Sequence, residues 1–253
     1  MLRTVCATRY AAPLREGGSL PGLVEADDDG MYVVKFRAAG QGLKALVAEV
    51  LVGRLAQTLG LPVPELVTVE VSPQLGRTEP DAEINELVSS SAGLNFGIDF
   101  LPGALDYSPA RPGDVEPDLA SEVVWFDALT TNVDRTPRNP NLLLWHDHLW
   151  LIDHGAALYQ HHGSSDLLPR AREGFPLIKE HVLLPRASAL AAADERLPDR
   201  LDAEQIDAAL ADVPDEWLGE DPAAARRSYR EYLLARLEPP RTFAEEAARA
   251  YAG

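Results

Sequence analysis

Two carboxylates and one amide frame a pair of short apolar segments in the middle of the chain. Asp134 is followed by Asn139 after five residues and by Asp153 after nineteen residues. Pro137 and Pro140 interrupt any helix here, so Asp134 and Asn139 belong to an irregular loop. Carboxylate and amide oxygens that converge with open coordination positions suit Mg²⁺, which keeps substrate phosphates in its shell. This stretch is therefore a candidate site for metal-assisted phosphoryl transfer.

The apolar segments between these side chains are expected to return Asp153 to Asn139. Residues 142–145 (LLLW) and 149–152 (LWLI) are predicted strands joined by the sequence HDH. A hairpin of this kind brings the chain back close to where it began. Gly155 leaves room for a close approach of the backbone. The alternative, which the combination of residues disfavours, is a surface hairpin with polar ends.

A lysine and a glutamate in the first part of the chain could form an ion pair. Lys35 is one of only three lysines and ends the apolar run MYVVKF. A lysine there must reach solvent or meet a negative partner, and its compact ammonium suits a phosphate oxygen. Glu49 has apolar neighbours in a predicted helix, where a charge costs free energy unless it is paired. The alternatives are an edge-strand lysine and a glutamate at the rim of an amphipathic helix.

Two further sets of residues carry weaker signals. Gly17, Gly18 and Ser19 separate the first two predicted strands, where a glycine-rich loop can present backbone N–H groups to phosphates. The same sequence is also typical of an ordinary turn. Histidine pairs in the sequences HDH and QHHG have no accompanying acidic residues at ligand spacing, which disfavours zinc.

The first sixty residues are predicted to form a small sheet and one helix. Residues 4–10, 22–26 and 31–36 are expected to form a three-stranded antiparallel sheet, because the DDDG turn is a strong hairpin signal. Residues 45–60 have apolar side chains at helical spacing. Gly60 suits the position just after a helix.

The rest of the chain changes from strands to helices. Residues 62–72 and 94–105 are predicted strands, the second ending in a Pro-Gly turn, with a polar stretch of helix or loop between them. Residues 107–117 contain three prolines and indicate a boundary. Residues 119–132 are a predicted helix that leads into the Asp134 loop. After the hairpin, several amphipathic or Ala/Leu-rich segments predict a mostly helical remainder.

Composition and charge limit the classes of protein. The 253 residues are 46% hydrophobic and 25% charged, as in soluble globular proteins, and no apolar run is long enough to span a membrane. The net charge of −17 argues against nonspecific binding to nucleic acid or anionic membranes, which requires basic residues. The N-terminus has no signal-peptide pattern. Cys6 is the only cysteine, which fits a cytoplasmic location.

The order of these features resembles the protein-kinase-like fold. The sequences YVVKF, NVDRTPRNPNLL and LWLIDHGAAL resemble the HipA-like kinases, specifically the short, stand-alone HipA-like kinase domain proteins of bacteria. The resemblance spans roughly residues 10–165. It implies an α+β, two-lobed fold. Residues 1–103 would form a small N-terminal lobe with an antiparallel sheet and a helix, and residues 104–253 a larger, mostly helical C-terminal lobe.

The resemblance also implies roles for the candidate residues. Lys35 would hold the phosphates of ATP, and Glu49 would hold Lys35. Asp134 would orient and deprotonate the acceptor hydroxyl. Asn139 and Asp153 would bind Mg²⁺. Positioning and charge neutralisation do most of the work in this chemistry.

The remaining contacts with ATP are implied in the same way. The backbone of Asp99, Phe100 and Leu101, in the linker between the lobes, would contact adenine. The Gly-Gly-Ser loop would cover the phosphates, and a phosphate on its serine would repel ATP and inhibit. His154 stands where many protein kinases have Phe, so Phe-based switching is not expected. The additional N-terminal subdomain of full-length HipA toxins is not expected from this sequence, so the resemblance does not imply a toxin role.

Three classes of function follow from the sequence. The first is a kinase of HipA-like type that uses ATP and Mg²⁺ to phosphorylate a Ser/Thr hydroxyl of a protein. The second is a small-molecule kinase on the same fold, for which the acidic charge would suit a cationic acceptor. The third is a non-catalytic nucleotide-binding adaptor, which the complete set of polar groups disfavours. The identity of the acceptor has no legible code in the sequence.

Overall fold

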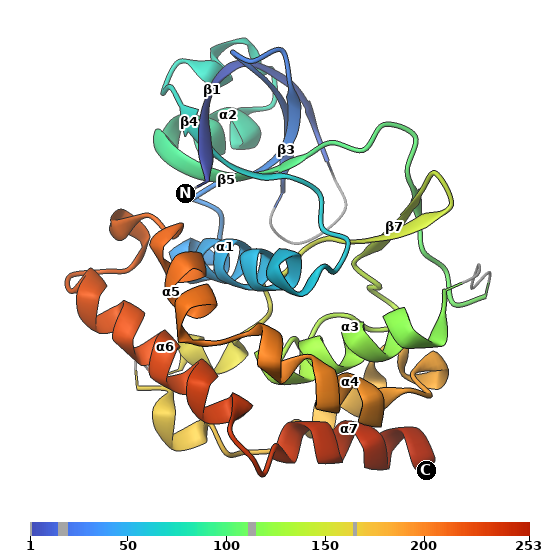
Figure 1. Ribbon diagram of the computed structural model, residues 1–253. Helices are drawn as coiled ribbons and strands as arrows, with labels where there is room; N and C mark the ends of the chain where they lie inside the picture. The colour runs from blue at the N-terminus through green and yellow to red at the C-terminus, as the bar shows by residue number, and fades with distance from the viewer. Residues whose placement is uncertain (1, 15–19, 111–114, 164–165) are drawn as a thin grey trace.

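The computed structural model describes residues 2–14, 20–110, 115–163 and 166–253. A strand-rich N-terminal part is followed by a mostly helical C-terminal part (Figure 1), so the predicted combination of a small sheet and a helical remainder is confirmed. Gly17, Gly18 and Ser19 lie outside the described residues. None of the described helices is long and apolar enough to cross a membrane.

A closed barrel of five strands forms the N-terminal part of the described chain. Strands β1 (Arg3–Pro13), β2 (Gly22–Ala26) and β3 (Met31–Lys35) pair antiparallel, as predicted. Strands β5 (Gly93–Asp99) and β4 (Leu66–Val71) extend the sheet in the order β1-β2-β3-β5-β4. The small N-terminal sheet is not antiparallel throughout, because β4, in addition to the three predicted strands, pairs with β1 in parallel and closes the barrel. Closure leaves neither strand with an unpaired edge, and strand periodicity alone does not reveal it.

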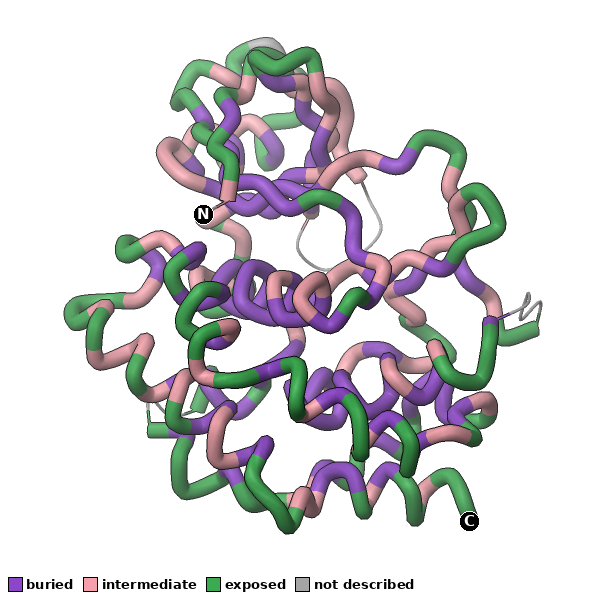
Figure 2. Tube along the Cα trace, viewed as in Figure 1, coloured by how far each residue is buried: buried purple, intermediate pink, exposed green. Residues whose placement is uncertain are grey.

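Helix α1 (Gly42–Leu59) lies between the barrel and the later helices (Figure 1). It ends at Gly60, whose φ of 79° is the left-handed conformation predicted for that position. Most of α1 is buried, as Figure 2 shows. Its apolar side chains belong to the core of the C-terminal part, whereas the barrel has a separate core of residues such as Val24, Val34 and Val69. Glu49 therefore lies on a helix between the barrel and the helical part of the protein.

Two short elements connect β4 to β5. They are a 3₁₀ turn, η1 (Leu75–Thr78), and helix α2 (Ala82–Ser90), which packs Ile84 and Val88 against the barrel core. The side chain of Asp81 caps α2 by accepting hydrogen bonds from the backbone N–H groups of Glu83 and Ile84. The polar stretch predicted as a mixture of helix and loop thus contains both.

A second sheet lies at the start of the helical part. The predicted hairpin is present as β7 (Leu142–Trp145) and β8 (His148–Leu151). A two-residue strand, β6 (Leu105–Asp106), pairs with β7, so the described strands here number three. The strand predicted over residues 94–105 was too long, because β5 ends before the Pro-Gly turn and the chain then crosses to β6. Two residues are too few to give a periodic signal.

Helices make up the remainder. The described α-helices are α3 (Pro117–Thr130), α4 (Leu190–Arg196), α5 (Ala203–Ala211), α6 (Pro222–Leu237) and α7 (Thr242–Ala252). The 3₁₀ turns are η2 (Tyr159–His162), η3 (Leu168–Arg170), η4 (Pro176–Glu180), η5 (Leu184–Arg186), η6 (Pro198–Arg200) and η7 (Asp215–Trp217). Residues 175–184, which have a helix-like pattern, form only short turns there. Pro176 and Pro185 lack the N–H that a continuous helix requires.

Candidate active site

Lys35, at the end of β3, joins two carboxylates from distant parts of the chain. Its Nζ lies 2.5 Å from Oε1 of Glu49 on α1 and 2.5 Å from Oδ1 of Asp153, which follows β8. Lys35 is 8% exposed and Glu49 is fully buried. The alternatives of an edge-strand lysine in solvent and a glutamate at a helix rim were therefore wrong. The ion pair expected from the sequence is present.

Burial and charge act against each other in this group. Burial alone would favour a neutral Lys35, but Glu49 and Asp153 outweigh it and raise the pKa of the ammonium. Burial raises the pKa of Glu49, whose Oε2 also accepts a hydrogen bond of 2.9 Å from the backbone N–H of His154. At Asp153, burial is outweighed by Lys35, which lowers the pKa of the carboxyl. Lys35 is thus a fixed positive charge beside Asp153.

The backbone around Asp153 is closely packed. Asp153 has a φ of 55°, a left-handed conformation that costs roughly 1–2 kcal/mol for most residues other than glycine. A Cβ at Gly155 would lie 2.8 Å from Oε1 of Glu49. This position has no room for a side chain, in agreement with the close backbone approach expected from the sequence.

Asp134 and Asn139 lie in the loop after α3. Nδ2 of Asn139 donates to Oδ2 of Asp134 at 2.7 Å, and Nδ2 of Asn141 donates to the same oxygen at 3.3 Å. The backbone N–H of Asp134 donates to Oδ1 of Asn132 at 3.1 Å. The sequence analysis missed Asn132 and Asn141, although the repeated asparagines in NVDRTPRNPN were an available signal.

A cleft of about 730 Å³ contains the predicted loop and hairpin residues together. Asp134, Asn139 and Asp153 line it, and so do Arg138 and Gly155. Lys35 reaches this group through its contact with Asp153. The three residues named from their spacing in the sequence therefore share one cavity, in which the hairpin returns Asp153 to the loop of Asp134 and Asn139.

The residues that the resemblance assigns to adenine binding are not part of this cleft. Asp99, Phe100 and Leu101 do not line this cleft. The N–H of Asp99 donates to the carbonyl of Glu65 at 2.8 Å, and the N–H of Phe100 donates to the carbonyl of Met31 at 3.0 Å. Both donors are occupied within the protein, so an adenine contact in this linker would use other backbone groups. That contact stays a prediction.

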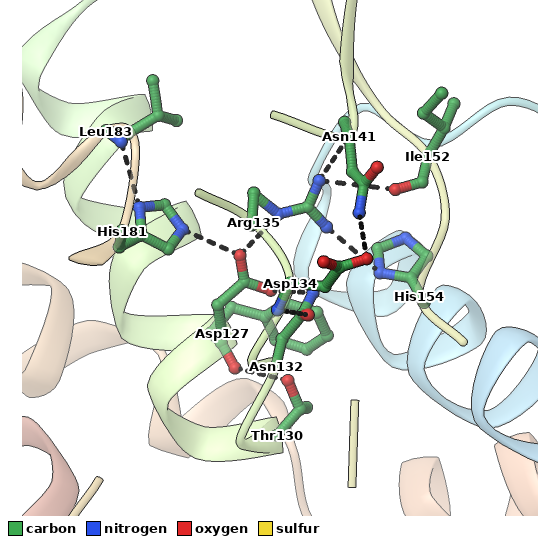
Figure 3. Close-up of polar contacts among 11 residues, drawn as sticks. Asp127, Thr130, Asn132, Asp134, Arg135, Asn141, Ile152, His154, His181 and Leu183 are labelled. Atoms are coloured by element: carbon green, nitrogen blue, oxygen red, sulfur yellow. Dashed lines mark hydrogen bonds and ion pairs between the residues drawn. The ribbon is translucent and has the colours of Figure 1, made fainter. Parts of the chain in front are cut away.

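A buried ion pair supports the loop from behind (Figure 3). Oδ2 of Asp127 on α3 lies 2.6 Å from Nε of Arg135 and 2.9 Å from Nε2 of His181. Burial would raise the pKa of Asp127, but the guanidinium of Arg135 outweighs it and holds this pKa well below its usual range. Arg135 also donates to the backbone carbonyls of Asn141 and Ile152. Its side chain thereby connects the loop to the residues directly before and after the hairpin.

His154 is a neutral ring inside this network. Its Nδ1 lies 3.4 Å from Nη2 of Arg135. A guanidinium only donates, so Nδ1 is assigned as the acceptor and Nε2 as the protonated nitrogen. His154 is fully buried, and burial lowers its pKa to about 3. The residue is therefore a buried, uncharged ring beside Arg135.

Replacing His154 with Phe is expected to reduce the decrease in the free energy of unfolding that occurs as the pH falls from 7 to 5. An unfolded histidine takes up a proton near pH 6.5, whereas the folded His154 does so only at a pKa of about 3. The unfolded state therefore binds more protons as the pH falls, and the free energy of unfolding decreases. Between pH 7 and pH 5 this residue accounts for about 2 kcal/mol of that decrease.

Urea unfolding at pH 7 and at pH 5 gives the loss of unfolding free energy on acidification. The effect is the difference between this loss in the parent and in His154→Phe. The matched control is His148→Phe, because His148 is exposed at the tip of the hairpin. Equal losses on acidification in the parent and in His154→Phe would contradict a buried neutral His154.

The donor groups of the cleft determine which cation could bind. Among the residues that the structure describes, no three His, Cys, Asp or Glu side chains are grouped to hold a metal. The cleft instead has the carboxylate of Asp153 and the amide oxygen of Asn139, whose nitrogen is used by Asp134. Hard oxygen donors in small number fit Mg²⁺, which completes its shell with water and phosphate oxygens. The residues thus fit a divalent cation bound together with a phosphate ligand.

Comparisons with known proteins agree with this geometry. The family model of the HipA-like kinases matches residues 9–238. None of the curated proteins matches the sequence. The proinflammatory kinase CtkA of Helicobacter pylori is similar in structure with a TM-score of 0.58 at 13% identity, covering 99% of this chain and 98% of that chain.

A second similar structure is the Golgi casein kinase with Mn/ADP bound. Its TM-score is 0.54 at 13% identity, and the match covers 98% of this chain and 74% of that chain. Another structure of the Golgi casein kinase gives 0.52 at 12% identity, covering 99% and 73%. At this identity the likenesses show a kinase-like fold. Because the family model covers most of the sequence, the chain belongs to the HipA-like kinase family.

Proposed function

We propose that this protein is an ATP- and Mg²⁺-dependent kinase that phosphorylates a Ser/Thr hydroxyl of a protein. The observation that carries the proposal is the cleft lined by Asp134, Asn139 and Asp153, with Lys35 held against Asp153. Membership of the HipA-like kinase family supports kinase activity. The structural likeness to a kinase with Mn/ADP bound supports the use of a nucleotide and a divalent cation.

In this proposal the nucleotide side of the cleft is held by charge. Lys35 binds phosphate oxygens, and the buried Glu49 keeps the ammonium in place. Asp153 and Asn139 would hold the divalent cation, which supplies neutralising charge for the transferred phosphoryl group. Without a nucleotide, Lys35 and Asp153 neutralise each other. On binding, the phosphates would give Lys35 a negative partner and the cation would give Asp153 a positive one.

Within the residues that the structure describes, no hydrogen bond reaches Oδ1 of Asp134, so this oxygen is available for the acceptor. Its Oδ2 accepts from two amides, those of Asn139 and Asn141. Oδ1 would accept the proton of the acceptor hydroxyl while the hydroxyl oxygen bonds to the γ-phosphorus. The bond from that phosphorus to the bridging oxygen breaks, and ADP leaves with the electron pair.

The proposal also includes the two lobes. Residues 1–103 would form the smaller lobe and residues 104–253 the larger one, with the linker of Asp99, Phe100 and Leu101 against adenine. The loop of residues 17–19 would cover the phosphates. The separate core of the barrel supports such a division, although α1 packs with the later helices.

Mg²⁺-ATP is expected to stabilise the protein, because a ligand that binds only the folded state shifts unfolding by mass action. At about a hundred times the dissociation constant the gain is about 2.7 kcal/mol. The measurement is the melting temperature with ATP and Mg²⁺, with EDTA as the control that should reduce the shift. No shift at millimolar ATP, with or without metal, would contradict a kinase.

Transfer itself is tested with γ-labelled ATP, Mg²⁺ and a cell lysate. Label in serine or threonine of lysate proteins is the expected result. Label in a small metabolite would replace the protein acceptor by a small-molecule acceptor on the same fold. Binding of ATP without any transfer would leave the adaptor function.

A further inference from the structure

Asn141 joins the two sides of the cleft. Its Nδ2 donates to Oδ2 of Asp134 at 3.3 Å, as Figure 3 shows. Its backbone oxygen accepts from the N–H of Ile152 at 3.2 Å, and Ile152 directly precedes Asp153. Asn141, Asp134 and Asp153 all line the cleft. Asn141 therefore contacts Asp134 through its side chain and the residue before Asp153 through its backbone.

The backbone of Asn141 is held in an uncommon conformation. Its φ is 50°, in the left-handed region that asparagine tolerates better than most residues. Its carbonyl accepts from the guanidinium of Arg135 as well as from Ile152. Uncommon conformations that the surroundings fix in this way gather at functional sites. The hydrogen bonds from Arg135 and Ile152 thus fix the backbone position from which the Asn141 side chain extends.

The two ends of the Asn141 amide are in different situations. The nitrogen is the end that faces Asp134, because a carboxylate only accepts. Within the described parts of the chain, no hydrogen bond reaches the amide oxygen of Asn141. The residue is half-buried, whereas Asn139 is exposed. An unused amide oxygen in the cleft of Asp153 is the kind of hard donor that divalent cations bind.

The geometry points to Asn141 as a further ligand of the divalent cation, in addition to Asn139 and Asp153. This inference rests on the proposed function. One amide then serves both halves of the reaction, with its oxygen on the cation and its nitrogen on Asp134. A cation on the amide oxygen polarises the amide and strengthens the hydrogen bond that its N–H donates to Asp134. Occupation of the metal site thereby fixes the carboxylate that takes the acceptor's proton.

Two substitutions separate the ends of this side chain. Asn141→Gly removes both ends and keeps the backbone conformation, because glycine readily adopts positive φ. Asn141→Asp keeps an oxygen ligand and loses the N–H donor. The probe is Mn²⁺ in the presence of ADP and without an acceptor, so that nothing turns over. Free Mn²⁺ is counted by its paramagnetic resonance signal, and the amount that ADP binds without protein is subtracted.

Asn141→Gly is expected to weaken Mn²⁺ binding by about tenfold or more. Asn141→Asp is expected to bind Mn²⁺ at least as tightly as the parent, yet to transfer phosphate poorly because Asp134 has lost a donor and gained a like charge. The matched control is Asp147→Gly, at an exposed position of the hairpin tip with a φ of 63°. It should leave Mn²⁺ binding unchanged.

The outcomes distinguish this inference from the proposed function. Parent-like Mn²⁺ affinity in Asn141→Gly, with slow transfer, would overturn the inference and leave Asn141 to act only on Asp134. Should Asn141→Gly not fold, a loss of Mn²⁺ affinity in Asn141→Asp overturns it equally. A parent protein that binds no Mn²⁺ with ADP would defeat the proposed function, and the inference with it.

Discussion

Asp134→Asn is expected to slow phosphoryl transfer by about a thousandfold while nucleotide affinity stays within about twofold. The new amide still offers an oxygen to Asn139 and Asn141, so the loop keeps its hydrogen bonds. It has no lone pair basic enough to take the acceptor's proton, and positioned general bases contribute roughly 10²–10⁴-fold to rate. Single-turnover transfer of label and a nucleotide titration measure the two quantities separately.

Two other variants make that result specific. Asp147→Asn changes the same residue type at the exposed hairpin tip and should turn over like the parent. Asp153→Asn should weaken Mg²⁺-ATP binding as well as transfer, because Asp153 would hold the metal. Parent-like turnover by Asp134→Asn would show that Asp134 is not the base.

The candidate site was predictable where local sequence dictates local structure. Lys35 follows an apolar run and Glu49 lies among apolar residues of a helix, so each was expected to need an oppositely charged partner. The prolines after Asp134 predicted a loop. The hairpin that follows was expected to bring Asp153 back to Asn139. The contact between Lys35 and Asp153, which are 118 residues apart, was not predicted, because the sequence indicated only Glu49 as the partner of Lys35.

The parts that could not be predicted depend on contacts that leave no periodic trace. The parallel pairing of β1 with β4 is a choice between sheet edges, and β6 is only two residues long. Asp127 lies in the apolar sequence VVWFDALT, and a charge there signals a buried partner. The sequence does not indicate that the partners are Arg135, eight residues away, and His181, at 54 residues.

Asp127→Asn is expected to destabilise the protein by about 3–5 kcal/mol, the usual result of leaving one member of a buried ion pair without its partner. Asp127 and Arg135 are both fully buried at the side chain. The pKa of Asp127 lies below its usual range, so the charged pair stabilises the protein at neutral pH, and this stability is lost as the pH falls below about 4. Urea unfolding at pH 7 measures the loss.

The control for this loss is an exposed pair. Asp207 lies 2.8 Å from Arg230, with 53% and 38% of the side chains exposed. Asp207→Asn should cost at most about 1 kcal/mol, as is usual for surface ion pairs. A similar small cost for Asp127→Asn would show that the buried pair does not hold the loop.

A double variant separates stability from function in the same network. Asp127→Asn combined with Arg135→Met removes both buried charges and fills the space with an apolar chain, so it should recover part of the stability that Asp127→Asn loses. It should not recover phosphoryl transfer, because methionine cannot donate to the carbonyls of Asn141 and Ile152. Recovery of both properties would mean that the Asp134 loop keeps its position without Arg135. Recovery of stability alone would assign Arg135 to the positioning of Asp134 against the metal side of the cleft.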